Sequence, residues 1–152
     1  LLFLFQPVNR PLTNAAAPGG ILSLQLAWTP TRAQTMLDSW DAQARLFAAF
    51  GLGFDYLFML VYAIALALGA LLAAGRHPGW FGRLGAWAGS GAFLAALLDA
   101  LENLGQFQQL FHGRADLAAP IGVLATLKFT LILLVLLYGL AGWVWPGPRQ
   151  AR

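Results

Sequence analysis

The chain has 152 residues, of which 59% are hydrophobic and 10% are charged. Soluble domains carry about 25% charged residues, so a chain this apolar is not expected to fold as an ordinary soluble domain. The formal net charge is +3, but the lysines and arginines are scattered, and no basic patch interleaved with aromatic residues points to a nucleic-acid partner. The chain has no cysteine, which excludes disulfides, thiolate chemistry and iron–sulfur centres.

The first segment, Leu1 to Phe5, is purely apolar and is followed by residues that break helices. Such a start predicts either the last turn of an N-terminal transmembrane helix or the apolar region of a signal peptide. We favour the helix, because the charge distribution described below requires the chain to begin on the inner side of the membrane.

Residues 6–50 form an outer segment with structure of its own. The pair Thr29-Pro30 resembles a helix N-cap followed by proline at the first helical position. Apolar residues then recur at helical spacing, which predicts an amphipathic helix over about 30–48 that lies on the outer interface or caps the bundle. Before it, leucines alternate with other residues between Leu22 and Trp28, and this pattern predicts a short extended stretch.

Three later segments are long and apolar enough to cross about 30 Å of hydrocarbon as helices: residues 51–74, 84–110 and 118–145. The connections between them are short, so sequential helices should be antiparallel. The expected fold is therefore all-α: an antiparallel transmembrane helix bundle in a single membrane domain over residues 1–152. It would have three complete helices, the end of a fourth and the outer amphipathic helix.

The arginine content of the connections sets the expected orientation. Residues 75–83 and the tail after Trp145 contain arginines but no acidic residue, whereas the arginines of the other connections are accompanied by aspartates. Short loops rich in lysine and arginine stay in the cytoplasm. We therefore expect a multi-pass membrane protein with its C-terminus in the cytoplasm.

Small residues line one side of the helix expected over 84–110. They form a Gly-x-x-x-Gly pair and a series of alanines at every fourth position: Gly85, Gly89, Ala88, Ala92, Ala96 and Ala100. Side chains this small let another membrane helix approach closely. We therefore expect this face to pack against a neighbouring helix.

Polar residues interrupt the same helix at i, i+3, i+4 and i+7 and so project from one face: Asp99, Glu102, Asn103 and Gln106. Asp55 and Lys128, on the neighbouring helices, fall at a similar depth of roughly 12 to 20 Å below the outer ends, and Tyr62 lies deeper on the face of Asp55. A charge at the centre of a membrane costs roughly 2.5 to 3.5 kcal/mol. We therefore expect these side chains to turn inward and meet in one cluster.

The charges of this cluster do not balance, because three carboxyl groups face one ammonium group. Like charges and desolvation both favour the neutral form of a carboxyl, so we expect either a protonated carboxyl or a bound cation. A second interpretation is structural: polar contacts between the helices would only fix their register. Both interpretations are kept at this point.

The sequence contains no Gly-rich phosphate loop, no nucleophile elbow and no His-Glu-x-x-His motif. His77 and His112 are expected on opposite sides of the membrane, so no metal or haem site and no other cofactor is predicted. If the protein is an enzyme, Asp99 and Glu102 are the candidate catalytic residues.

Two runs, Gly53 to Phe58 and Leu98 to Asn103, together with Lys128 in the last helix, resemble a group of small, uncharacterised bacterial four-helix integral membrane proteins. The resemblance also takes in Ile21 to Trp40 and so covers most of the chain. It departs at the start, where nearly all of the group's first helix is missing. The resemblance implies the architecture, the position of the cluster and a location in the bacterial cytoplasmic (inner) membrane, and it implies no reaction.

These features are compatible with several functions. The leading hypothesis is a non-enzymatic membrane protein built around the cluster, either an accessory subunit of a membrane complex or a binder of lipid or a small ligand. The first alternative is a membrane enzyme acting on a lipid or isoprenoid, with Asp99 and Glu102 as an acid/base pair. The second is proton or cation conduction. The expected partners are membrane lipids and other membrane-protein subunits.

Overall fold

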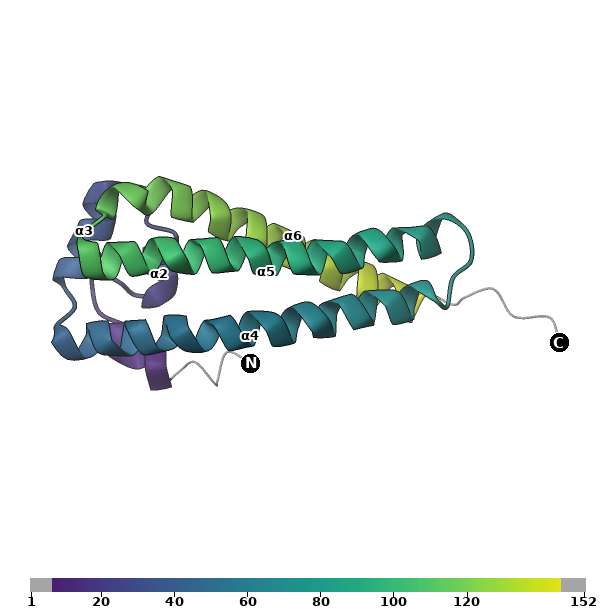
Figure 1. The fold of residues 1–152 in the computed structure, drawn as a ribbon, viewed down its shortest axis with the longest axis horizontal. Coiled ribbons are helices and arrows are strands. Elements are labelled where there is room, and N and C mark those ends of the chain that lie inside the picture. Colours follow the sequence, from purple (N-terminus) through teal and green to yellow (C-terminus); the bar gives the residue numbers. More distant parts are fainter. Residues whose placement is uncertain (1–6, 146–152) are drawn as a thin grey trace. The chain divides into compact units, whose positions relative to one another are not determined.

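The structure, a computed structural model, describes residues 7–145, and these residues contain helices and short connections but no strand. Long apolar helices pack against each other, namely α4 (Ala42–Ala74), α5 (Trp80–His112) and α6 (Ala118–Val144) (Figure 1). The prediction of an all-α fold is therefore confirmed. The predicted end of an N-terminal helix, Leu1 to Phe5, lies outside the described residues.

Each of the three helices is long and apolar enough to cross a membrane, judged by length and composition. α4 begins at Ala42 and not at residue 51, because the Asp41 carboxylate accepts a hydrogen bond from the backbone N–H of Ala44 at 2.7 Å and caps the helix. α5 begins directly after Gly79, whose φ of 86° suits glycine. Apolar runs therefore locate the helices but miss their polar ends.

The outer amphipathic helix is shorter than predicted. α3 (Pro30–Asp38) begins with the expected cap at Thr29, but it ends about ten residues before the predicted end. The guanidinium of Arg45 donates hydrogen bonds to the carbonyl oxygens of Leu37 at 2.7 Å and Trp40 at 3.2 Å. Carbonyl groups at a helix end need such partners, so Arg45 stabilises this end of α3 from the first turn of α4.

The first part of the stretch expected to be extended, residues 22–25, is helical instead and belongs to α2 (Ile21–Gln25), whereas residues 26–28 are not helical. An alternation this short cannot distinguish a strand from a helix. The Asn9 side chain fixes the start of α2, since it accepts a hydrogen bond from the N–H of Ile21 at 2.9 Å and donates one to the carbonyl of Gly19 at 3.2 Å. Gly20 has a φ of 61°, and a methyl group on it would collide with the Asn9 side chain. This turn therefore requires glycine.

Residues 7–145 form two compact units: the first takes its residues from 7–58 and 99–126, and the second from 59–98 and 127–145. In the first unit, the outer segment and the long helices share one core, whose large buried residues include Leu12, Leu24, Leu37, Trp40, Leu52 and Leu110. The segment includes the short helix η1 (Arg10–Leu12), and the Trp40 indole donates a hydrogen bond to the carbonyl of Leu12 at 2.8 Å. The outer segment is thus packed onto the helices.

The core of the second unit is built largely from small side chains: Ala67, Ala70, Ala92 and Val135. Here a methyl group on Gly85 of α5 would collide with Ala74, and one on Gly142 of α6 would come within 2.7 Å of the Ala73 side chain. Close approach of this kind is typical of helices packed through glycine and alanine. Of the other small residues named from the sequence, Gly89 and Ala92 are buried, and Ala88, Ala96 and Ala100 are half-buried.

We expect Gly85→Ala to destabilise the protein and Gly139→Ala to leave it unchanged or slightly stabilised. The added methyl group collides with Ala74 at the first position, whereas nothing lies within 4 Å of it at the second. Overpacking costs about 1–3 kcal/mol, whereas alanine is favoured over glycine in a helix by about 0.5–1 kcal/mol. Thermal unfolding in detergent micelles, followed by circular dichroism, measures both variants. Equal unfolding midpoints would contradict the close approach at Gly85.

Candidate functional site

One face of α5 is buried, and its character changes along the helix. Its buried positions recur every three or four residues, as one side of a helix does: Gly85, Gly89, Ala92, Ala95, Asp99, Glu102, Asn103, Gln106, Gln109 and Leu110. Those before residue 99 have small side chains, and the later ones are polar except for Leu110. We call the polar set, Asp99, Glu102, Asn103, Gln106 and Gln109, the polar stripe.

The polar stripe is buried while apolar neighbours on the same helix are exposed. Glu102 and Asn103 are 0% exposed, whereas Leu101 and Leu104, which flank them in the chain, are 48% and 54% exposed. This is the reverse of the usual arrangement in soluble proteins, where charged side chains are almost never fully buried unless they are paired. The polar chemistry of α5 therefore lies in the interior of the first unit.

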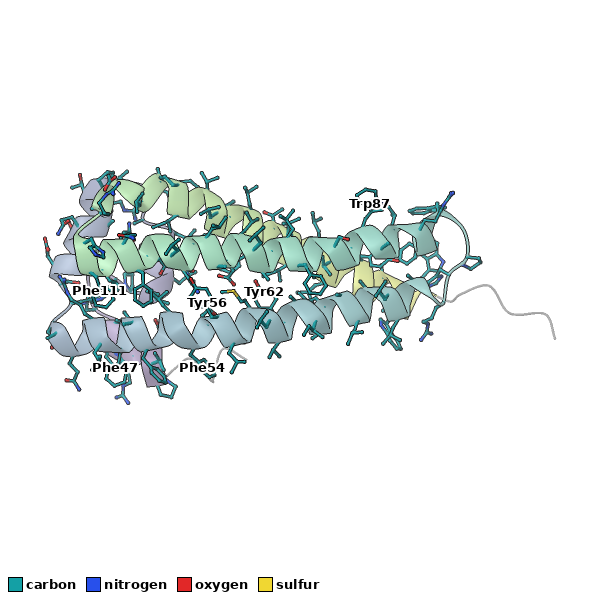
Figure 2. The ribbon with its side chains drawn as sticks, viewed as in Figure 1. Phe47, Phe54, Tyr56, Tyr62, Trp87 and Phe111 are labelled. Atoms are coloured by element: carbon teal, nitrogen blue, oxygen red, sulfur yellow. The ribbon has the colours of Figure 1, made fainter. Side chains whose placement is uncertain are left out.

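Asp55 of α4 contacts the polar stripe from the neighbouring helix. The side-chain amide nitrogen of Asn103 donates a hydrogen bond to Asp55 Oδ2 at 2.8 Å. In this contact the nitrogen of the Asn103 amide faces Asp55, since an amide nitrogen donates hydrogen bonds and does not accept them. The next residue, Tyr56, donates from its hydroxyl to the carbonyl of Ala100 at 3.2 Å, and it lies on the opposite side of α4 from Phe54 (Figure 2).

A second carboxyl is paired within the polar stripe itself. Gln106 donates a hydrogen bond from Nε2 to Glu102 Oε1 at 2.8 Å, across one turn of α5. The Gln106 amide is therefore oriented in the same way as that of Asn103. In both residues the nitrogen faces a carboxyl group, which leaves the carbonyl oxygen for another partner.

The amides of the polar stripe keep polar atoms that have no hydrogen-bond partner among residues 7–145. These atoms are Asn103 Oδ1, Gln106 Oε1 and both the oxygen and the nitrogen of the Gln109 amide. A buried polar group without a partner costs about 1–3 kcal/mol, and proteins pair nearly all such groups with protein, water or a bound species. Most of the unmatched atoms are acceptors, so the polar stripe suits a species that donates hydrogen bonds or carries positive charge.

Two residues that the sequence assigned to the cluster, Tyr62 and Lys128, belong to the second unit, whereas Asp55 and the polar stripe belong to the first. Lys128 is nevertheless buried, and its ammonium group lies 4.6 Å from the centre of the Phe129 ring. At this distance a cation is attracted to the face of an aromatic ring. Tyr62 is half-buried on α4.

Gln109 is the member of the polar stripe that the sequence prediction omitted. It stands three residues after Gln106 and seven after Glu102, so the helical spacing that singled out the other members includes it. A polar residue next to the expected helix end at residue 110 would ordinarily be solvated. In the structure α5 continues to His112, and Gln109 is buried.

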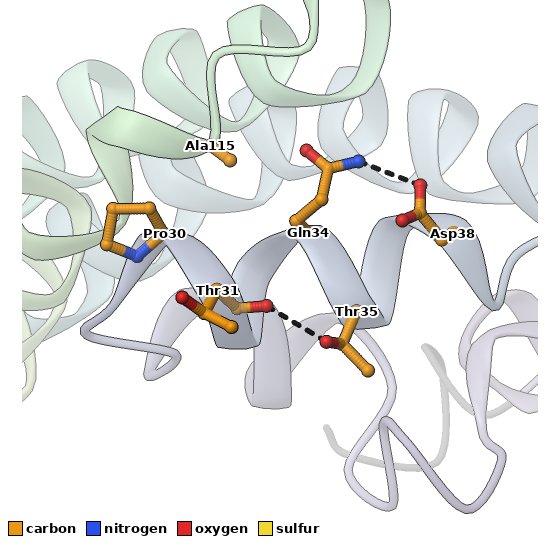
Figure 3. A pocket seen from close by; sticks show the side chains of 6 residues that line it. All are labelled: Pro30, Thr31, Gln34, Thr35, Asp38 and Ala115. Carbon is orange, nitrogen blue, oxygen red and sulfur yellow. Dashed lines mark hydrogen bonds between the residues drawn. The ribbon is translucent and has the colours of Figure 1, made fainter.

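A pocket of about 450 Å³ lies elsewhere in the first unit, between α3 and the short helix η2 (Ala115–Leu117). Its lining consists of Pro30, Thr31, Gln34, Thr35, Asp38 and Ala115 (Figure 3). The polar side chains are exposed, and two hydrogen bonds lie within α3: Gln34 donates to Asp38 at 2.7 Å, and the Thr35 hydroxyl donates to the backbone carbonyl of Thr31 at 2.9 Å. This pocket therefore offers a solvated surface that holds none of the buried unmatched polar atoms, and the polar stripe is the stronger candidate site.

No protein-family model, no curated protein and no solved structure matches the chain. A function therefore has to be inferred from the chemistry of the residues themselves. The polar stripe is the part of the described chain where that chemistry is concentrated, since five of the six buried polar or charged side chains belong to it.

Replacing Gln109 by methionine should raise the thermal stability of the protein. The change keeps a long, flexible side chain and removes buried amide atoms that have no partner among the described residues, which relieves a cost of about 1–3 kcal/mol. Asn103→Leu should lower the stability, because it breaks the hydrogen bond to Asp55. Thermal unfolding in detergent, in a buffer free of metal salts, measures both variants. A lower midpoint for Gln109→Met would show that this amide is satisfied inside the protein.

Proposed function

We propose that the chain is an integral membrane protein whose three long helices cross a bilayer. The support is the surface of these helices, on which large apolar side chains are exposed throughout. Leu72 of α4, Leu97 of α5 and Leu140 of α6 are 61%, 56% and 60% exposed. Soluble proteins rarely expose contiguous apolar patches larger than a few hundred Å², whereas lipid tails are as apolar as leucine and cover such a surface.

The proposed topology follows from the connections. Short connections make the three helices antiparallel, and Arg76 and Arg83 assign the turn between α4 and α5 to the cytoplasmic side of a bacterial inner membrane. The C-terminus then faces the cytoplasm as well. On the other side, Arg114 donates hydrogen bonds to both carboxylate oxygens of Asp116 at 2.9 and 2.8 Å, and this contact lowers the pKa of Asp116. An exposed, ionised pair suits a loop in water.

The function we infer is the binding of a small ligand at the polar stripe, without catalysis. The observation that carries this inference is the set of buried amide atoms on Asn103, Gln106 and Gln109 that have no partner among residues 7–145. Side chains that only fix the register of helices gain from being matched, and a half-matched network is less stable than an apolar core. Buried polar atoms that lower the stability of a protein and are nevertheless present together on one helix face are typical of a functional site.

The burial of the carboxyl groups favours binding over chemistry on a lipid. Asp99 and Glu102, the candidate acid and base, are both buried. Neither lines the pocket between α3 and η2, and neither lines a smaller pocket of about 120 Å³ beside His77 and Trp80 in the second unit. A lipid or isoprenoid chain needs a wide entrance to reach them, whereas a species of one or a few atoms fits between packed side chains. Lipids and other membrane-protein subunits are proposed to contact the apolar outer faces of the helices.

Substituted cysteines test the proposed topology, and the native chain has no cysteine that would interfere. We expect His112→Cys to react with a membrane-impermeant maleimide in cells whose outer membrane has been removed and whose inner membrane is intact. Pro78→Cys should react only after the inner membrane is permeabilised, because α5 separates these two exposed positions. Labelling of both positions from the same side would contradict a transmembrane α5.

Native mass spectrometry of the protein released from detergent micelles tests ligand binding. We expect an added mass on the wild type that is lost in the double variant Gln106→Met, Gln109→Met, because that variant lacks two amides of the polar stripe. The control is Gln108→Met, which changes a half-buried glutamine of the same helix that lies outside the stripe and should keep the added mass. A bare, monomeric wild-type protein that holds no ion, lipid or partner would contradict the proposed function.

A further inference from the structure

We propose that the polar stripe binds an alkali-metal cation, sodium or potassium, through the side-chain carbonyl oxygens of Asn103, Gln106 and Gln109. This inference rests on the proposed function and names the class of the ligand. It is carried by the orientation of the amides, by the negative charge around them and by the kind of oxygen that they offer.

The side-chain amides of Asn103 and Gln106 are oriented by neighbouring carboxyl groups. Asn103 and Gln106 each donate their side-chain N–H to a carboxyl oxygen at 2.8 Å, the first to Asp55 and the second to Glu102. Each carboxyl group therefore takes the donor half of an amide. The remaining oxygens, Oδ1 of Asn103 and Oε1 of Gln106, are buried and have no hydrogen-bond partner in the part of the chain that the structure describes. Such an arrangement presents acceptors only, and it is satisfied by a cation or by a donor.

The three amides of the polar stripe are evenly spaced along α5. Positions 103, 106 and 109 follow one another at intervals of three residues on the buried face of α5. Successive amides are therefore displaced by roughly 4.5 Å along the helix axis. Glutamine side chains are flexible enough to span this rise, and the Gln109 amide has no partner among residues 7–145 that would hold its oxygen away. One ion can thus be reached by oxygens from two or three of these positions.

Acidic side chains accompany the amides in the first unit. The carboxyl groups of Asp55, Asp99 and Glu102 all lie in the first unit, as the amides do. Carboxyl groups that are ionised attract a cation and repel an anion, and the low dielectric of a buried site strengthens both effects. An anionic ligand would meet the opposite conditions.

The type of oxygen that the amides offer indicates which ion would bind. Zinc prefers nitrogen and sulfur ligands, and calcium prefers about six to eight oxygens that include carboxylates. The residues that the structure describes include no group of three or more histidine, aspartate or glutamate side chains arranged to hold a metal ion. Neutral carbonyl oxygens are instead the groups that replace the hydration shell of an alkali cation. The donor set therefore favours sodium or potassium over a divalent metal.

Thermal unfolding of the full chain in detergent tests this inference. The probes are NaCl, KCl and choline chloride at equal ionic strength, because general screening of charges is the same in all three salts. We expect the unfolding midpoint to rise by several °C with increasing NaCl or KCl and to level off at saturation, as a ligand that binds only the folded state requires. In choline chloride alone the midpoint should stay constant.

Gln109→Met is the most informative variant, because the wild-type side chain has no hydrogen bond to lose within residues 7–145 and the fold is expected to persist. We expect the concentration of cation for half-maximal stabilisation to increase roughly tenfold, which corresponds to the loss of one good ligand. Gln106→Met should weaken the cation response at least as much. The matched control, Gln108→Met, should respond as the wild type does, since this residue lies outside the polar stripe.

Equal midpoints in the three salts would overturn the inference. If native mass spectrometry then still showed an added mass on the wild type, the proposed function would stand with a ligand of another class. If the wild type were also bare, both the inference and the proposed function would fall. A full cation response in both Gln106→Met and Gln109→Met would equally overturn the inference, because the ion would then bind elsewhere.

Discussion

Every buried polar group must find its partner within the chain or on something that the chain binds, because neither the core of a bilayer nor a packed helix interior supplies water freely. α4, α5 and α6 meet this requirement for their backbones by being helical. The side chains of the polar stripe meet it only in part, since Asn103 and Gln106 are matched at their nitrogens and not at their oxygens. The functional proposal depends on this incomplete matching.

The buried polar groups of the outer segment also need hydrogen-bond partners, but they find them in a different way. Its backbone is less regular, so side chains supply the missing partners. Asn9 pairs with the start of α2, the Trp40 indole pairs with the carbonyl of Leu12, and Arg45 pairs with the end of α3. These contacts join residues that are distant in sequence, so they hold the segment together as a compact layer in the first unit.

The sequence predicted what depends on length and composition, and it missed what depends on a distant partner. The apolar runs located the three long helices, because a span of that length has few alternatives. The end of α3 depends on Arg45 and the helical form of α2 depends on Asn9, and neither contact has a local signal. Helical spacing placed four members of the polar stripe on one face, and extending the same spacing would have added Gln109. No spacing rule, however, predicts which amide atoms are left unmatched.

The shared core of the first unit has a consequence for the order in which the protein is made. Leu12, Leu24 and Trp40 pack with Leu110 of α5, which follows Trp40 by 70 residues. Ribosomes add about 5 to 20 residues per second, so the outer segment exists for roughly 4 to 14 s before that residue has been synthesised. In the proposed topology the segment has by then been delivered to the outer side of the membrane. It is therefore among the first parts to be exported and among the last to fold.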